Sequence, residues 1–286
     1  MPITVVIYEE RSRRRSKITC EAMKAGITAV GDRVRYQMES DYGGPDGDVA
    51  VFYGMAGKCG RIFEDYRKAG KPVVYIDLGY WGRRAGGEVG RWKGYHKLSV
   101  NARHPTAYFQ RRQHDARRAE KLGLTIASWR PKGKHILVAG MGAKAANFEG
   151  LGVLEWERGA IREIRERTGR PIIFRPKPNC AISKPIPGTV FSAGTQPLAD
   201  VLADCHAVVT HHSNVACDAL LAGVPTFCWQ GVAAPLSLND LRQIEAPNLS
   251  GDRRRWLNDV SYCQYHVGEM TEGVAWRHLK DEGLVP

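Results

Sequence analysis

The pattern of apolar and polar positions in the first half of the chain predicts strands that alternate with helices. Short apolar runs bounded by turn residues are expected to be buried strands, and longer amphipathic stretches are expected to be helices. The expected strands are Ile3–Tyr8, Val34–Met38, Val49–Tyr53, Pro72–Leu78 and 95–100, and the expected helices cover 12–25, 54–69 and 106–122. This alternation is typical of a mostly parallel sheet with helices on both faces.

The same pattern starts again near residue 135. Expected strands are His135–Ala139, Ile172–Phe174, Ala207–Val209 and Thr226–Trp229, and expected helices cover 153–168, 196–203 and the residues after Asn214. Residues 128–134, SWRPKGK, are expected to link the two halves. The sequence therefore predicts an α/β protein with two Rossmann-like domains facing each other across a cleft. We expect an N-terminal domain over 1–125 and a C-terminal domain over 126–286, with the C-terminal helices packing back on the first domain.

Length and composition agree with a packed protein of this size. The chain has 286 residues, of which 43% are hydrophobic, and contains no apolar run long enough to span a membrane. Its N-terminus is apolar first and charged second, which is the reverse of a signal peptide, so we expect a cytoplasmic location. The seven cysteines include no CxxC pair and are expected to be reduced, buried thiols.

The formal net charge of +12 predicts a polyanionic partner such as nucleic acid, an anionic lipid surface or an acidic polysaccharide. Basic residues concentrate after the first and fourth expected strands, where Tyr80 and Trp81 lie among them. A basic loop with aromatic residues suits a phosphate backbone with stacked bases. The candidate nucleic-acid-binding residues are Arg11, Arg13, Arg14, Arg15, Arg83, Arg84, Arg91 and Lys93.

The stretch Val208–Pro225 carries the densest group of polar side chains at a strand end. Donors and acceptors gather where the strand becomes a helix, at Thr210, His211, His212, Ser213 and Asn214. The junction between a strand and a helix is where open α/β sheets bind ligands. Asp218 follows Asn214 by four residues, on about the same helical face, and its carboxylate could hold the hydroxyls of a ribose. The alternative is that Ser213 or Asn214 only caps the helix.

Two further strand ends in the second half carry glycine or positive charge. The strand at 135–139 leads into GMGAK, with Gly142 and Lys144, and the strand at 172–174 leads into Arg175 and Lys177. Because parallel strands point their carboxyl ends the same way, these groups should converge with Asp218. Glycine backbone and three cations suit a diphosphate, so a nucleotide-diphosphate site is predicted. The dinucleotide motif GxGxxG does not occur near residue 140.

Residues 135–231 resemble the donor-binding half of the two-Rossmann-domain glycosyltransferases, which have the GT-B fold. The run S-N-x-x-x-D-A-L-x-A-G-x-P at 213–225 is similar to their recurring S-x-x-x-E-A-x-x-x-G-x-P, with Asp218 in place of the usual Glu. Residues 235–276 resemble the ends of bacteriophage-encoded and capsule-type glycosyltransferases. DLGYW (77–81) and NARHP (101–105) look like the first half of the phage group.

This resemblance implies an enzyme that uses a nucleotide-diphosphate sugar, most simply a UDP-sugar, as co-substrate and holds no cofactor tightly. The cations Lys144, Arg175 and Lys177 could stabilise the leaving diphosphate without a metal. An inverting enzyme also needs a base, for which Asp77 is the first candidate and His104 the second. No metal site is expected from His206, His211 and His212, because neighbouring residues on a strand point to opposite faces. The GxSxG motif of hydrolases does not occur.

We expect first a glycosyltransferase that modifies a hydroxyl on a hydroxymethylated or similar pyrimidine in phage DNA, with the base flipped into the active site. A glycosyltransferase acting on cell-surface or capsular polysaccharide is the alternative and would use the basic residues for an anionic glycan. A further alternative is a non-catalytic nucleic-acid-binding protein on a GT-B scaffold. The sequence leaves the sugar, the donor base, the acceptor base, the stereochemical outcome and the oligomeric state open.

Overall fold

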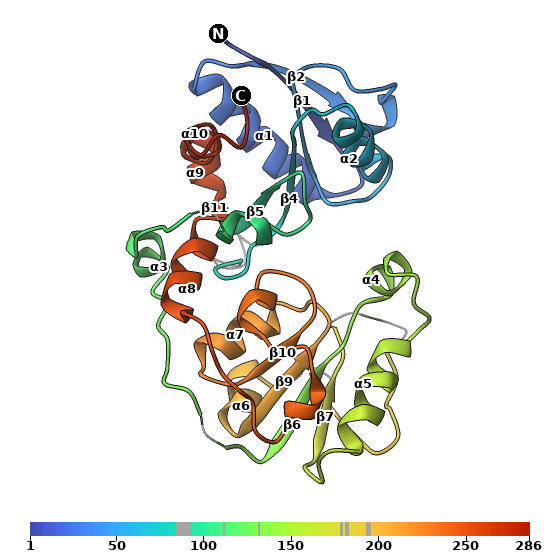
Figure 1. Ribbon diagram of the computed structural model, residues 1–286. Coiled ribbons are helices and arrows are strands. Elements are labelled where there is room, and N and C mark those ends of the chain that lie inside the picture. Colours follow the sequence, from blue (N-terminus) through green and yellow to red (C-terminus); the bar gives the residue numbers. More distant parts are fainter. Residues whose placement is uncertain (84–92, 111, 131, 178–179, 181–182, 193–195) are drawn as a thin grey trace. The chain divides into compact units, whose positions relative to one another are not determined.

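The computed structural model describes the chain apart from residues 84–92, 111, 131, 178–179, 181–182 and 193–195, and describes residues 109, 110 and 144 without their side chains. The chain forms two compact units, each with its own sheet (Figure 1). Unit 1 comprises Met1–Tyr108 and Asp259–Pro286, and unit 2 comprises Phe109–Asn258. None of the helices in the described part of the chain has the length and apolar character that a bilayer crossing requires.

Unit 1 contains a mixed sheet with the strand order β11-β5-β4-β3-β1-β2. β1, β2, β3 and β4 run parallel, while β5 and β11 are antiparallel to their neighbours. Its elements are β1 (Thr4–Glu9), α1 (Arg14–Ala29), β2 (Arg33–Met38), η1 (Glu39–Asp41), β3 (Val49–Tyr53), α2 (Cys59–Lys68), β4 (Val73–Leu78), β5 (Tyr95–Val100), η2 (Thr106–Gln110), β11 (Gln264–His266), α9 (Val267–Thr271) and α10 (Val274–Asp281).

Helices cover both faces of the unit 1 sheet (Figure 1). On one face, α1, α9 and α10 bury apolar side chains against the sheet, among them Met23, Met270 and Trp276. On the other face, α2 packs Ile62 and Tyr66 against it. α1 and α9 approach so closely that a Cβ at Gly26 would lie 1.9 Å from the backbone oxygen of Met270. The C-terminal segment is therefore part of the unit 1 core.

Unit 2 contains a parallel sheet with the strand order β10-β9-β6-β7-β8. α5 packs on one face with Ile161 and Ile164, while α6 and α7 pack on the other with Val201 and Ala219. Its elements are α3 (Arg117–Lys121), β6 (His135–Ala139), α4 (Ala143–Phe148), α5 (Glu155–Arg165), β7 (Ile172–Arg175), β8 (Val190–Phe191), α6 (Leu198–Ala203), β9 (Cys205–Thr210), α7 (Val215–Leu221), β10 (Thr226–Cys228), η3 (Ala234–Leu236), η4 (Leu241–Gln243) and α8 (Arg253–Ser261), which runs into unit 1.

The units divide the chain differently from the expected boundary at 125/126. The division falls at 108/109 and again at 258/259. The expected linker at 128–134 is bonded to unit 2 at two described residues: Arg130 N donates to Gly223 O at 2.7 Å, and Lys134 N donates to Asp204 O at 2.7 Å. The unit 1 sheet is completed by β11, which comes from the C-terminal part of the chain and pairs with β5. Sequence pattern alone does not reveal this long-range pairing.

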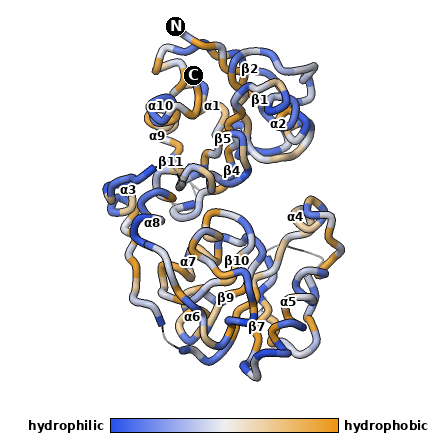
Figure 2. Tube along the Cα trace, viewed as in Figure 1, coloured by the Kyte–Doolittle hydropathy of each residue, from blue (hydrophilic) through white to orange (hydrophobic). Residues whose placement is uncertain are grey.

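The charged helix expected over 106–122 is wrong in extent. The chain forms a 3-10 helix at Thr106–Gln110 and a short α-helix at Arg117–Lys121. Figure 2 shows α3 as strongly hydrophilic, so it has little apolar surface with which to stabilise a longer helix. Asp115 accepts a hydrogen bond from Arg117 N at 3.1 Å just before α3 begins.

Candidate functional site

The carboxyl ends of the unit 2 strands gather most of the residues that the sequence assigned to the donor. After β6, the loop through Gly142 leads into α4, and its Met141 N–H donates to the Glu157 carboxylate at 2.7 Å. Glu157 is a buried residue of α5. This carboxylate therefore holds the glycine loop in place through a hydrogen bond to its backbone. Nothing in the sequence pattern pointed to this role for Glu157. Lys144 lies in α4, and its side chain is outside the described part of the chain.

Lys177 and Gly142 come together from two different strand ends. A Cβ at Gly142 would lie 2.9 Å from Lys177 Cδ, so the lysine stem packs directly on the glycine. The Lys177 residue is otherwise exposed. Arg175, at the end of β7, donates from Nη1 to Gln196 O at 2.9 Å. The structure thus joins Lys177 to the glycine loop, whereas Arg175 holds the segment that precedes α6.

The hydroxyls of Thr210 and Ser213 shape the turn between β9 and α7. Thr210 is buried, and its Oγ1 donates to Ala139 O at 2.9 Å, which ties the ends of β9 and β6 together. Ser213 Oγ accepts from Val215 N at 3.3 Å. Asn214 occupies the N-cap position without a side-chain cap bond among the described residues. Asp218 lies further along α7 and is partly buried.

His211 and His212 belong to a polar and aromatic group that also contains Trp156 and Trp229, of which only the histidines could be selected from the sequence. Their Nδ1 atoms lie 2.9 Å apart, so one ring donates a hydrogen bond to the other. The His211 ring packs edge-on against the Trp156 ring, with 5.8 Å between the ring centres, and the centres of the Trp156 and Trp229 rings are 5.7 Å apart. Burial lowers the pKa of His211, which the charges of Glu149 and Glu157 oppose only in part. This imidazole is therefore neutral near pH 7.

Gln230 and Glu149 add hydrogen-bonding groups to the same strand end. Gln230 Nε2 donates to Glu149 Oε2 at 3.1 Å, and the N–H groups of Trp229 and Gln230 both donate to His211 O. Trp156 lies in α5 and Glu149 directly follows α4, and no local pattern would have identified these residues, which are far from this motif in sequence. His206 lies at the other end of β9, where its Nε2 lies 2.9 Å from Ile244 O.

In unit 1, the two candidate bases lie around one buried lysine. Asp77 Oδ2 accepts from the Tyr75 hydroxyl at 2.7 Å, and Asp77 Oδ1 accepts from Leu78 N at 2.8 Å. Asp77 pairs with Lys97 in the β4–β5 register. Lys97 Nζ lies 3.5 Å from His104 Nδ1 and 5.3 Å from the centre of the Tyr75 ring. Asp77 and His104 are therefore brought into one cluster.

The same cluster raises the pKa of the Tyr75 hydroxyl. Burial raises the pKa of Tyr75, and the negative charge of Asp77 raises it further. Tyr75 therefore remains protonated and donates its hydrogen bond to Asp77. Tyr75 and Lys97 were not among the residues assigned from the sequence.

The candidate nucleic-acid-binding residues do not form a uniform set of exposed cations. Arg13 pairs with Glu10, and Arg15 Nη1 donates to the Tyr53 hydroxyl at 3.4 Å. Arg11 Nε contacts Met38 Sδ, and Arg83 donates to the backbone oxygens of Gly79 and Tyr80. Arg14 and Lys93 are exposed. Arg84 and Arg91 lie outside the described residues.

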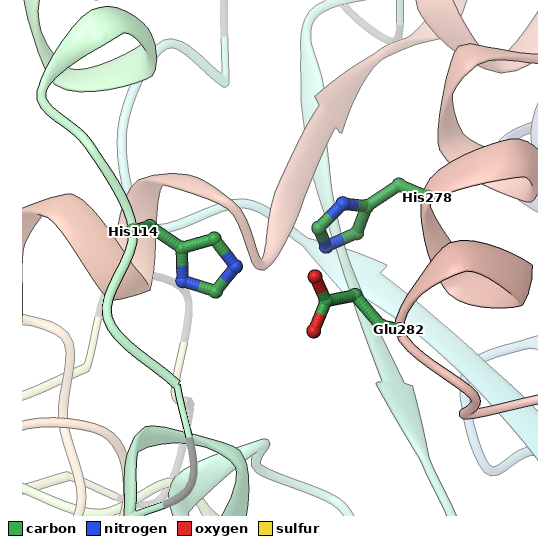
Figure 3. A group of neighbouring side chains, drawn as sticks. All are labelled: His114, His278 and Glu282. Atoms are coloured by element: carbon green, nitrogen blue, oxygen red, sulfur yellow. The ribbon is translucent and has the colours of Figure 1, made fainter.

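His278 and Glu282 form a further polar pair at the end of α10 in unit 1 (Figure 3). His278 Nε2 is 3.0 Å from the Tyr108 hydroxyl, and Glu282 follows His278 by one helical turn. Burial raises the pKa of Tyr108, and the Glu282 charge raises it further. His114, also labelled in Figure 3, belongs to unit 2.

Comparison with known proteins identifies the fold. No family model and no curated protein matches the sequence. Among solved structures, the chain is similar to a KpsC beta Kdo 2,4 transferase of Thermosulfurimonas dismutans, with a TM-score of 0.55 and 13% identity over 93% of this chain and 92% of that one. It is equally similar to a KpsC beta Kdo 2,7 transferase of the same organism, with a TM-score of 0.55 and 12% identity over 96% of this chain and 99% of that one.

These similarities extend over nearly the whole chain and confirm the expected α/β fold of two Rossmann-like units. The chain has the GT-B-like fold that residues 135–231 predicted. At this level of identity the likeness concerns the fold, and the chemistry has to be argued from the residues themselves.

Proposed function

We propose that the protein is a glycosyltransferase that moves a sugar from a nucleotide-activated donor to a hydroxyl of a saccharide acceptor, of the cell-surface or capsular kind. The observation that carries this proposal is the full-length similarity of the fold to two Kdo transferases. It favours a saccharide over the modified DNA base that the sequence pattern put first. Neither similar protein is named for a nucleic-acid substrate.

Unit 2 offers the chemistry that a nucleotide-sugar donor needs. Lys177 packs its stem on Gly142 and leaves its exposed ammonium group at the glycine loop. A cation held at this position would stabilise the negative charge that develops on the leaving phosphate. Arg175 is the second candidate, since it ends the neighbouring strand. Trp156, His211 and Trp229 offer aromatic surface for the nucleobase, and Asp218 offers a carboxylate for the ribose.

Unit 1 offers the candidate base. In an inverting reaction the acceptor oxygen attacks the anomeric carbon, its proton passes to a carboxylate, and the bond to the leaving phosphate breaks. Asp77 is our first candidate for this carboxylate and His104 remains the second. The Tyr75 hydroxyl donates to one Asp77 oxygen at 2.7 Å and would hold the carboxylate in a fixed orientation.

Modified DNA remains a second candidate acceptor because of the net charge of +12. Binding to DNA through phosphate contacts would weaken steeply as salt concentration rises. A DNA acceptor would also require a flipped base, so only duplexes that carry a hydroxymethylated pyrimidine should be modified.

The proposal is tested by combining donor binding with transfer. The full-length protein is incubated with uridine-, guanosine- and cytidine-nucleotide sugars and with activated Kdo, and thermal unfolding reports which donor binds. Each donor that binds is then offered capsular oligosaccharides and hydroxymethylated DNA, and mass spectrometry detects the product. Failure of every donor both to bind and to react would contradict the proposal. Transfer to DNA alone would restore the second candidate.

Two lysines provide a matched test of the donor chemistry. Lys177→Ala should lower the transfer rate by about 10²-fold, since it removes charge at the leaving group. Lys184→Ala removes the same charge from an exposed position further along the same connection. Equal losses in both variants would show a general charge effect and would remove Lys177 from the donor site.

A further inference from the structure

The topological switch point of the unit 1 sheet lies between β1 and β3. β1 pairs with β2 on one side and with β3 on the other, all in parallel. The chain continues from β1 to β2 and from β3 to β4, so the connections leave this point in opposite directions. Open α/β sheets bind ligands outside the carboxyl ends of the strands at such a point. The segments that follow β1 and β3 occupy this position.

Arginine side chains from the α1 end connect these two segments. A Cβ at Gly54, which follows β3, would lie 3.6 Å from Arg13 Nη1. Arg13 Nε also forms an ion pair with Glu10 Oε2 at 3.1 Å, so its charge is largely compensated. Arg15, in the first turn of α1, donates to the Tyr53 hydroxyl at 3.4 Å. Arg15 therefore supplies positive charge at the switch point, where the N-terminus of a sixteen-residue helix adds a partial positive charge.

His96 adds a buried hydrogen-bond acceptor that has no partner among the described residues. The residue has 0% exposure, and its Nδ1 lies 3.1 Å from Gly94 O. Because that oxygen can only accept, Nδ1 carries the hydrogen and Nε2 carries a lone pair. Nε2 has no hydrogen-bond partner in the described part of the chain. Burial lowers the pKa of His96 to about 4, so the ring is neutral near pH 7.

His96 faces the beginning of α1. Leu98, two residues further along β5, packs in the cluster that contains Tyr53 and the α1 residue Met23, and alternate strand residues share a face. His96 pairs with Leu78, at the carboxyl end of β4. Its ring meets the Tyr53 ring edge-on at 5.9 Å. Arg15, Tyr53 and His96 thus form a continuous series of contacts from the first turn of α1 to the sheet.

Buried polar atoms without a partner are uncommon in protein interiors and call for an explanation, and His96 Nε2 is such an atom in a series of contacts that leads to a cation at the switch point. We propose that Arg15, Tyr53 and His96 form the binding site for an acidic sugar unit of the acceptor. Arg15 pairs with its anionic group, and His96 Nε2 accepts a hydrogen bond from one of its hydroxyls. The site opens when the partly exposed Arg15 side chain turns from Tyr53 to the ligand. This assignment rests on the proposed function and names the acceptor class and its contacts.

Binding of the full-length protein to an oligosaccharide that contains glucuronate tests this site, with a neutral glucose oligosaccharide and inorganic phosphate as comparison ligands. Arg15→Gln and His96→Asn should each weaken binding of the acidic oligosaccharide at least about tenfold, because asparagine keeps a donor toward Gly94 O but removes Nε2. His96→Gln restores a polar group near the Nε2 position and should recover most of the affinity. Lys17→Gln, an exposed change on the same helix with the same loss of charge, should leave binding unchanged.

Several results would overturn the site. These are no binding of the acidic oligosaccharide by the unchanged protein, equal binding of the neutral one, or equal loss in the Lys17→Gln variant. Binding of hydroxymethylated DNA through Arg15, without saccharide binding, would also overturn it. Phosphate binding that depends on Arg15 and competes with the acidic oligosaccharide would support the anion contact and identify phosphate as a second source of the charge.

Thermal unfolding of the same variants separates this site from a structural role of His96 and from the proposed function. A purely structural histidine would lower the melting temperature in both His96 variants and leave affinity unchanged, which would overturn the site. If donors bind while no unit 1 variant alters acceptor binding, the site fails and the proposed function stands. If no donor binds but the acidic oligosaccharide does so through Arg15 and His96, the site stands and the proposed function fails.

Discussion

At the level of single residues, the side chains that matter most are those whose partners lie far away in sequence. Asp77, His211 and Lys177 could be selected from the sequence because they lie at or just beyond the ends of apolar strands. Glu157, Tyr75 and His96 could not, since their roles depend on burial and on contacts between elements. Sequence pattern therefore predicts where a site lies better than it predicts which groups complete it.

Replacement of the candidate base separates binding from chemistry. Asp77→Asn keeps the size of the side chain but removes its ability to take a proton, so transfer should fall by about 10²–10⁴-fold. Donor and acceptor affinity should remain within a factor of about three, because the change leaves the donor residues of unit 2 and the proposed acceptor contacts at Arg15 and His96 untouched. Steady-state rates and calorimetric affinities measure the two effects. Unchanged turnover would move the role to His104.

Loss of the Glu157 carboxylate should destabilise unit 2. Glu157→Leu leaves the Met141 N–H buried without an acceptor, which costs about 1–3 kcal/mol in the free energy of unfolding. Glu157→Gln can still accept from Met141 and serves as the control. Urea denaturation of the three proteins gives these free energies. A loss of equal size in both variants would contradict the hydrogen-bond explanation.

His96 also predicts a dependence of stability on pH. Burial lowers its pKa to about 4 in the folded protein from the ordinary histidine value of 6.5, so below pH 6.5 the unfolded chain takes up a proton that the folded protein does not. Stability is therefore lost as pH falls from 6.5 toward 4. Between about pH 7 and pH 5, the unfolding free energy of the unchanged protein should fall about 2 kcal/mol more than that of His96→Gln. Parallel curves would contradict this assignment.

At the level of elements, most strands coincide with the apolar runs that predicted them, because a buried parallel strand is apolar on both faces. β1, β3, β4, β6 and β9 all follow this rule. The short strand β11 does not follow this rule, and the helix expected over 106–122 is replaced by η2 and α3. β11 is defined by its antiparallel pairing with β5, and α3 has too little apolar surface to continue.

Two glycines in helices of unit 1 should respond in opposite ways to the same change. Gly26→Ala would push its Cβ into Met270 O, at 1.9 Å, and should destabilise the protein by about 1–3 kcal/mol through overpacking. At Gly60→Ala the new Cβ meets no atom of the described residues within 4 Å, so the change should leave stability unchanged or raise it by up to about 1 kcal/mol. Thermal unfolding distinguishes them. A tolerated Gly26→Ala would show that α1 and α9 separate easily.

At the level of the whole molecule, the two units differ in how the chain builds them. Unit 2 is one continuous segment, whereas unit 1 is assembled from both ends of the sequence. Tyr265, Met270 and Trp276 from the second segment lie in the same buried cluster as Val5 and Val51 from the first. The sequence led us to expect the C-terminal helices to pack on the first domain, but it did not predict that β11 joins its sheet, because apolar pattern does not show which sheet a distant strand joins.

Fragments of the chain should reflect this construction. The segment 109–258 contains the whole unit 2 sheet and should fold alone and keep its affinity for the donor nucleotide. The segment 1–108 lacks β11, α9 and α10 and should be unfolded or aggregated, because its α1 face would expose apolar surface. Circular dichroism and thermal unfolding with nucleotide measure both outcomes. A cooperative transition in 1–108 would contradict the second expectation.

The divided unit 1 also sets an order of events on the ribosome. The edge of β5 and the apolar face of α1 emerge before unit 2 is made, and β11 and α9, which cover them, emerge after it. At about 5–20 residues per second, synthesis of the intervening segment of about 150 residues takes roughly eight to thirty seconds. Unit 2 can finish folding in that interval while the nascent unit 1 still has an open strand edge. The first segment is therefore exposed to aggregation through this edge for a time that is set by the length of unit 2.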